Sequence, residues 1–209
     1  MDLDELIELM EVVAGDEIEK ANEVSFDNVL ELSTALDRNI YLGEIIYGTG
    51  KNIDELIRFW NRYDDAHNIP VEEREPIKIY IDSCGGSLVE TFTMIDSITM
   101  SKTPVWTICT GAAYSGGFFT FIAGHKRFAY PLASFLYHEG ATGTSADAGK
   151  FRNFAAFYEK QLKQLKDVVL KYTTINEETY EKHIKDDWWF TSEEALEYGI
   201  CDEISTKLI

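Results

Sequence analysis

The chain has 209 residues, 45% of them hydrophobic, so it is long enough to bury a sizeable core within one compact domain. Its formal net charge of −18 argues against nucleic acid or an anionic membrane as the main partner, although an acidic surface could serve a basic protein. The three cysteines, at 84, 109 and 201, are too far apart to suggest a zinc site or a disulfide framework. An acidic N-terminus and the lack of any run of about 18 apolar residues complete the expectation of a cytoplasmic protein.

The first segment is the most acidic part of the chain. Over residues 2–21, apolar residues recur at helical spacing between carboxylates, at Leu3, Leu6, Ile7, Met10 and Val13. This pattern predicts an amphipathic helix that is solvated on one side or docked on a neighbour. We therefore expect two parts, an acidic N-terminal helical appendage over residues 1–24 and one domain over residues 25–209.

Beyond residue 38, strand and helix patterns alternate. Helices are predicted over residues 52–66, 85–100, 115–124, 147–172 and 192–199, and strands over residues 39–45, 77–83, 104–110, 126–130 and 133–139. Asn52 with Glu55, and Thr191 with Glu194, have the spacing of capping boxes that begin a helix. Repeated strand–helix units predict an α/β fold with a largely parallel sheet.

Two strand-to-helix junctions carry paired glycines, "IDSCGGS" at residues 81–87 and "GAAYSGG" at residues 111–117. Helix N-termini hold unpaired N–H donors and positive potential, so two of them side by side could cradle a developing oxyanion. Glycines at such turns also serve simple geometry and close packing, and Ser115 does not lie in a G-x-S-x-G motif. The two explanations remain open at this point.

A nucleophilic serine needs a base, and the chain offers four histidines. His67 and His183 fall in polar helices and are expected at the surface, while His125 follows a helix end and could interact with the helix dipole. His138 ends an apolar strand beside the glycine-rich segment that follows, so it should emerge at the edge of the core. Asp186 or Asp187, beside two tryptophans, could orient its imidazole.

Taken in order, "IYIDSCGGS", "ICTGAAYSGG", "LYHEG" and "DDWWFTSEEALEYGICDEI" resemble the ClpP family of self-compartmentalised serine peptidases, over about residues 38–204. The resemblance implies the ClpP/crotonase-like fold of repeated β-β-α units, with residues 147–172 as the family's handle helix. It also implies that Ser115 is the nucleophile, His138 the general base and Asp187 the acid. The backbone N–H groups of Gly86 and Gly116 would then form the oxyanion hole.

The same resemblance implies a serine endopeptidase that hydrolyses peptides or unfolded proteins through an acyl-enzyme. Its sites would face a chamber formed by two stacked heptameric rings, a tetradecamer of this one chain. An ATP-driven AAA+ unfoldase would feed the chamber. No phosphate-binding loop is present here, so ATP would be used only by a separate chain, and no cofactor or metal is expected in this one.

Several positions depart from the family pattern. Cys84 stands where proline is usual, Asp82 where asparagine is usual, and Glu139-Gly140 where Gln-Pro is common. Asp186 replaces an arginine used in contacts between rings, and the acidic N-terminal helix replaces a short hairpin at the axial pore. Such departures would suit a phage-encoded or accessory member of the family.

Two other functions remain as alternatives. The altered ring-contact positions would fit a catalytically weak or inactive ring or scaffold subunit. The paired glycine donors would also fit a crotonase-like enzyme that holds an acyl-CoA thioester, although such an enzyme has no need of Ser115, His138 or Asp187.

Overall fold

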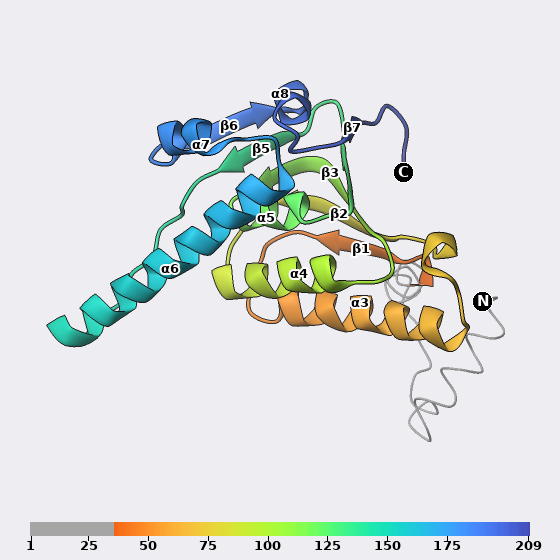
Figure 1. Cartoon of the computed structure of the whole chain (residues 1–209), viewed down its shortest axis with the longest axis horizontal. Helices are drawn as coiled ribbons and strands as arrows, with labels where there is room; N and C mark the ends of the chain where they lie inside the picture. The colour runs from red at the N-terminus through yellow and green to blue at the C-terminus, as the bar shows by residue number, and fades with distance from the viewer. Residues whose placement is uncertain (1–35) are drawn as a thin grey trace, which may run out of the picture. The chain divides into compact units, whose positions relative to one another are not determined.

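The computed structural model describes residues 36–209, so the predicted helix over residues 2–21 and the predicted boundary at residue 24 lie outside the described part. Residues 40–209 form one compact α/β unit built on a seven-stranded sheet, whose strands are mostly parallel (Figure 1). The strands are β1 (Asn39–Leu42), β2 (Ile77–Ser83), β3 (Val105–Tyr114), β4 (Lys126–Ala129), β5 (Ser134–Tyr137), β6 (Trp188–Thr191) and β7 (Glu203–Ile204). The α-helices are α3 (Thr49–Ala66), α4 (Leu88–Met100), α5 (Gly116–Ile122), α6 (Ala148–Tyr172), α7 (Glu177–His183) and α8 (Ser192–Glu197), with a 3₁₀ turn at Val71–Glu73. Within residues 36–209, no helix is both long enough and apolar enough to span a membrane.

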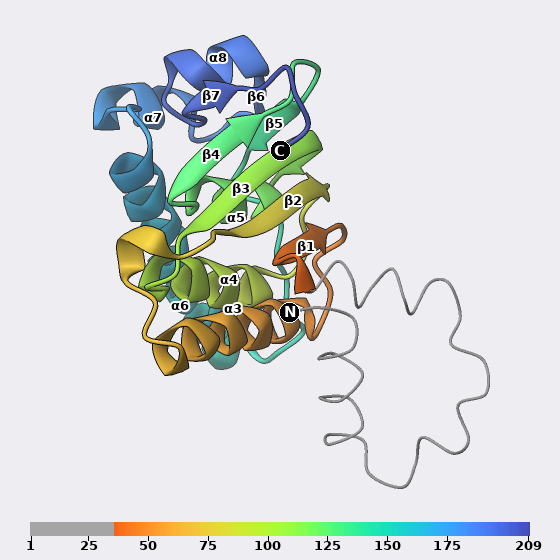
Figure 2. The ribbon, with the colours of Figure 1, turned by 90° about the vertical axis from the view of Figure 1, so that its right-hand side faces the viewer.

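The sheet divides at its longest strand, β3. One path runs in the order β1-β2-β3-β4-β7, as the neighbouring strands in Figure 2 show. The first half of β3 pairs with β4, whereas its last residues pair with β5 in parallel. Strand β6 then joins β5 in the antiparallel direction. The C-terminal ends of β3 and β5 therefore meet the start of β6 at one edge of the sheet.

The core lies mainly on one face of the sheet. In β2, Ile77, Ile79 and Ile81 are fully buried in the main cluster, which includes residues of α3, α4, α5 and α6. Tyr80 belongs instead to a smaller cluster with Ile108 and Phe128. Because successive side chains of a strand point to opposite faces, the smaller cluster covers the other side of the sheet. Each fully buried isoleucine contributes about 1.5–3 kcal/mol to stability.

Most of the predicted elements are present, and the capping signals had mixed success. Strand β2 has the predicted bounds, and α6 begins after Asp147, whose carboxylate accepts hydrogen bonds from the Gly149 and Lys150 N–H groups. The capping box of Thr191 and Glu194 is confirmed. The box predicted at Asn52 is wrong, because α3 begins three residues earlier, after Gly48 in a left-handed conformation.

Candidate active site

Ser115 lies at the turn between β3 and α5. Its φ of 53° and ψ of −120° are an uncommon conformation for a residue other than glycine, and backbone strain of this kind often marks functional sites. The turn is fixed on both sides, because the Ser115 N–H donates to the Leu136 carbonyl at 2.9 Å and the Ser115 carbonyl accepts from the Phe119 N–H at 3.2 Å. Within residues 36–209, its hydroxyl makes no hydrogen bond. The backbone of Ser115 is thus fixed by hydrogen bonds, while its hydroxyl has no partner among the described residues.

The two glycine turns lie against each other, as expected from neighbouring parallel strands. A Cβ on Gly85 would approach the Cβ of Ser115 to 2.7 Å and the nitrogen of Gly116 to 2.9 Å. Ile45 holds the first turn through two hydrogen bonds. Its N–H donates to the Gly85 carbonyl, and its carbonyl accepts from the Ser87 N–H. Neither the Gly86 nor the Gly116 N–H has a hydrogen-bond partner among the described residues. Both predicted oxyanion donors are therefore free and close to Ser115.

His138 and Asp187 are brought together by the register of β5 and β6. Tyr137 pairs with Trp188 in this antiparallel ladder, so the next residue of β5, His138, lies opposite the residue before β6, Asp187. The His138 Nδ1 atom is 3.5 Å from the Asp187 Oδ1 atom. This register places Asp187, rather than Asp186, beside His138. The side chain of Asp187 is 63% exposed, and that of His138 is 32% exposed.

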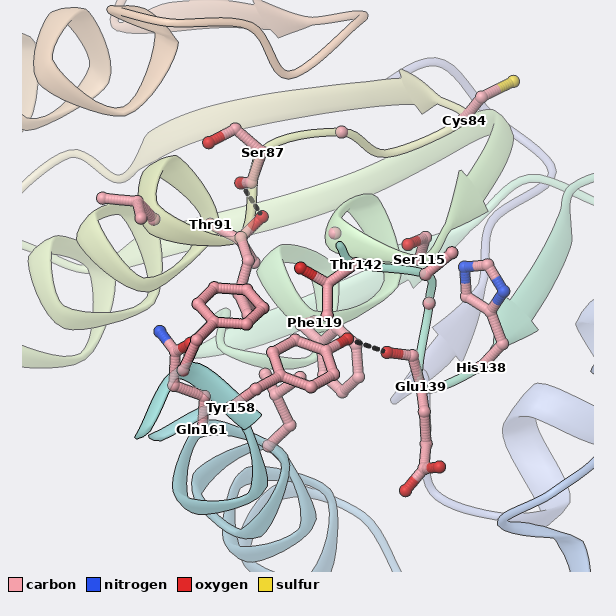
Figure 3. A pocket seen from close by; sticks show the side chains of 18 residues that line it. Cys84, Ser87, Thr91, Ser115, Phe119, His138, Glu139, Thr142, Tyr158 and Gln161 are labelled. Carbon is pink, nitrogen blue, oxygen red and sulfur yellow. Dashed lines mark hydrogen bonds between the residues drawn. The ribbon is translucent and has the colours of Figure 1, made fainter. Parts of the chain in front are cut away.

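Ser115 and His138 line one groove with a volume of about 540 Å³. Figure 3 shows the imidazole of His138 beside Ser115, with Cys84 at one end and Tyr158 of α6 at the other. The floor and walls also include Gly86, Gly116 and the apolar side chains Leu88, Phe119, Phe154 and Leu165. The apolar lining of this groove suits the binding of an extended peptide chain. The serine, the histidine and the free N–H donors that it exposes are the groups needed for attack on a carbonyl.

The segment after His138 is tied to the long helix α6. The Tyr158 hydroxyl donates a hydrogen bond to the Glu139 carbonyl at 2.8 Å, drawn as a dashed line in Figure 3. Burial, with repulsion from Glu159 and Glu181, raises the pKa of the Glu139 carboxyl. Gly140 has a φ of 74°, which the proline usual at this position in the ClpP family cannot adopt. The backbone at residue 140, beside the groove, is therefore one that proline could not adopt.

The groove wall on α6 was not among the predicted site residues. Phe154 and Tyr158 lie one helical turn apart, and their rings are nearly parallel with centroids 6.5 Å apart. Their spacing could have indicated a shared helix face, but only the fold shows that this face lines the same groove as Ser115.

The other three histidines have structural surroundings. The Nδ1 atom of His125 accepts a hydrogen bond from the Val105 N–H at 2.9 Å, and His67 lies against Tyr63 in α3. His183 is half-buried rather than at the surface, because it stacks on Trp188 with centroids 4.2 Å apart. None of the three lines the groove.

The departures at Asp82 and Cys84 also find a place in the fold. Strand β2 is irregular at Asp82, whose carboxylate accepts a hydrogen bond from the Ala112 N–H at 3.0 Å and so joins the two glycine turns. Cys84 is exposed at the groove, whereas Cys109 and Cys201 are buried, and all three are free thiols. Across residues 36–209, no cluster of three or more His, Cys, Asp or Glu side chains is arranged to hold a metal ion.

The protein-family model of the Clp protease family matches residues 70–207. This span begins just before β2 and ends after β7, so it contains both glycine turns, His138 and Asp187. The matched residues make up well over half of the chain, and the protein belongs to the Clp protease family.

Proposed function

We propose that this chain is a serine endopeptidase of the ClpP type, which hydrolyses peptides or unfolded proteins with Ser115, His138 and Asp187. The observation that carries the proposal is that three neighbouring strand ends, of β3, β5 and β6, bring these residues to one edge of the sheet. The free N–H groups of Gly86 and Gly116 beside Ser115 add the donors that would stabilise the oxyanion.

In the proposed mechanism, His138 takes the proton of Ser115 as its Oγ attacks the peptide carbonyl. The Gly86 and Gly116 N–H groups bind the oxyanion of the tetrahedral intermediate. His138 then gives the proton to the leaving amine, and water attacks the acyl-enzyme by the reverse sequence. The Asp187 carboxylate stabilises the imidazolium that forms in each half of the reaction.

The separation of His138 and Asp187, 3.5 Å, is longer than a hydrogen bond. Catalytic hydrogen bonds are often long without substrate and tighten in the complex, so the distance fits the role. A substrate in the groove would also pack against Tyr158 and the segment after His138, because both line the groove. We infer that substrate binding shortens the distance between His138 and Asp187.

We also propose that the enzyme works as a ring assembly supplied by a separate AAA+ unfoldase. The first half of α6 extends away from the sheet in Figure 1, and Phe151 and Phe157 on it are 51% and 57% exposed. Apolar side chains on an uncovered helix favour pairing with another copy of the chain. Asp186 is exposed at the position of a ring contact, so the native mass decides between one ring and two. The three free thiols favour a reducing compartment such as the cytoplasm.

A fluorophosphonate probe tests the proposed reaction directly. Pure wild-type protein should be labelled, peptide mapping should place the label on Ser115, and labelling should remove hydrolysis of short fluorogenic peptides. Native mass spectrometry of the same sample reports the assembly. An assembled protein that is neither labelled nor active would refute the peptidase and leave the ring or scaffold subunit.

Replacement of Asp187 by asparagine should lower kcat on the order of 10⁴-fold, because the imidazolium loses its negative partner and the imidazole its orientation. Asp186→Asn is the matched control, since this neighbouring carboxylate makes no ion pair with His138. Peptide hydrolysis should be compared at equal native mass. Equal losses in both variants, or none in Asp187→Asn, would mean that Asp187 is not the acid.

A further inference from the structure

Two buried tyrosines, Tyr137 and Tyr180, form a hydrogen bond with each other, and Tyr137 directly precedes His138 in the chain. The hydroxyl oxygens of Tyr137 and Tyr180 are 2.5 Å apart, and each residue is only 2% exposed. Their rings meet edge to face, with centroids 5.4 Å apart. Two apolar side chains could fill the same space without burying any polar atom. The presence of two hydroxyl groups here therefore needs an explanation.

The chain positions of the two tyrosines connect them to the site. Tyr137 is the last residue of β5 and directly precedes His138. Tyr180 is the buried residue of α7, the helix that leads through residues 184–186 to Asp187. The hydroxyl bond therefore joins the strand that presents the base to the helix that leads to the acid.

The other ties that hold α7 are weaker or less direct. Lys166 of α6 contacts Glu177 at 2.7 Å and Glu181 at 2.5 Å, but these carboxylates are 72% and 53% exposed, and such surface ion pairs stabilise little. His183 stacks on Trp188, which fixes the end of the helix against β6 rather than against β5. The Tyr137–Tyr180 bond is both buried and directional, and it links α7 to the strand of His138.

We propose that Tyr137 and Tyr180 are positioning residues, whose hydroxyl bond sets the separation of His138 and Asp187 in the substrate complex. This inference rests on the proposed function, since it needs the two residues to act as base and acid. It adds a role for two side chains that touch neither the substrate groove nor the reacting atoms.

The bond is stable over the working pH range of such an enzyme. Burial raises the pKa of the Tyr137 hydroxyl, further raised by its bond to Tyr180, and burial also raises the pKa of Tyr180. Both phenols thus stay neutral around pH 7, and the hydrogen bond between β5 and α7 is kept there.

The double variant Tyr137→Phe/Tyr180→Phe separates positioning from stability. Removal of both hydroxyls leaves no buried polar atom unpaired, so thermal stability should stay near that of the wild type. With α7 no longer tied to β5, kcat should fall about tenfold while KM changes less than about twofold. Tyr80→Phe is the control, because it removes a tyrosine hydrogen bond to the Ile209 carbonyl in the smaller cluster and should leave kcat unchanged.

The same double replacement in an Asp187→Asn background completes the test. If the tyrosines act through Asp187, they should cause no further loss there, measured as the rate of fluorophosphonate labelling. A tenfold loss in both backgrounds, an unchanged kcat, or a kcat that follows thermal stability would each overturn the positioning role. In each of those cases, active wild-type protein with labelled Ser115 would still support the proposed function, whereas an inert wild type would overturn both.

Discussion

Ser115→Ala should lower peptide hydrolysis on the order of 10⁶-fold and abolish fluorophosphonate labelling, because the acyl-enzyme can no longer form. The substitution removes only Oγ, which makes no hydrogen bond among the described residues, and alanine meets the same strain at a φ of 53°. Stability should therefore change by less than about 0.5 kcal/mol. Steady-state kinetics with a fluorogenic peptide, beside a thermal melt, measures both effects.

The matched control for Ser115→Ala is Ser97→Ala. Ser97 lies on α4 outside the groove, where its hydroxyl donates to the Asp54 carboxylate at 2.6 Å. This variant should lose some stability and keep its activity, the reverse of Ser115→Ala. Wild-type protein and Ser115→Ala that are equally inactive at the same native mass would contradict a peptidase and favour a scaffold subunit.

The glycine turns could be placed from sequence because each signal was local. Strand β2 follows from its alternating isoleucines and the start of β3 from a largely apolar run, and parallel strands that are consecutive in sequence tend to be neighbours. The turns after them must then meet at one edge of the sheet, which is where Gly85 approaches Ser115. The position of His138 at the edge of the core could likewise be predicted locally, because it ends an apolar strand.

The arrangement of His138 and Asp187 could be expected from resemblance but not from pattern. Strand β6, Trp188–Thr191, was not predicted, since its two tryptophans fit core or interface positions equally well. Its pairing with β5 joins segments about 50 residues apart, and register over such a distance depends on tertiary packing. The Tyr137–Tyr180 contact arises from the same packing and had no sequence signal.

The wrong start of α3 has a comparable physical reason. Asn52 and Glu55 have the spacing of a capping box, but Gly48 in a left-handed conformation ends the preceding turn earlier. The Glu90 carboxylate of α4 accepts the Gly50 N–H at 2.8 Å, so a residue 40 positions away satisfies the first turn of the helix. A capping signal of local origin was overridden by a contact between helices.

Gly86→Ala should damage both folding and catalysis. Gly86 has a φ of 146°, and a Cβ there would lie 2.1 Å from the Ile45 carbonyl oxygen, a backbone atom that cannot move aside alone. Relief of that overlap requires a shift of the turn, at a cost of about 3 kcal/mol or more in the free energy of unfolding. Chemical denaturation of the variant measures this loss.

The shifted turn should also remove one oxyanion donor, which lowers kcat by about 10²–10³-fold in protein that remains folded. Gly43→Ala is the control, since a Cβ there meets no atom within 4 Å and its φ is ordinary, so stability and kcat should both stay unchanged. A loss of stability without a loss of kcat in the folded fraction would exclude the Gly86 N–H as a donor. The Gly116 N–H would then have to stabilise the oxyanion without it, and the close approach of Gly85 to Ser115 would serve packing alone.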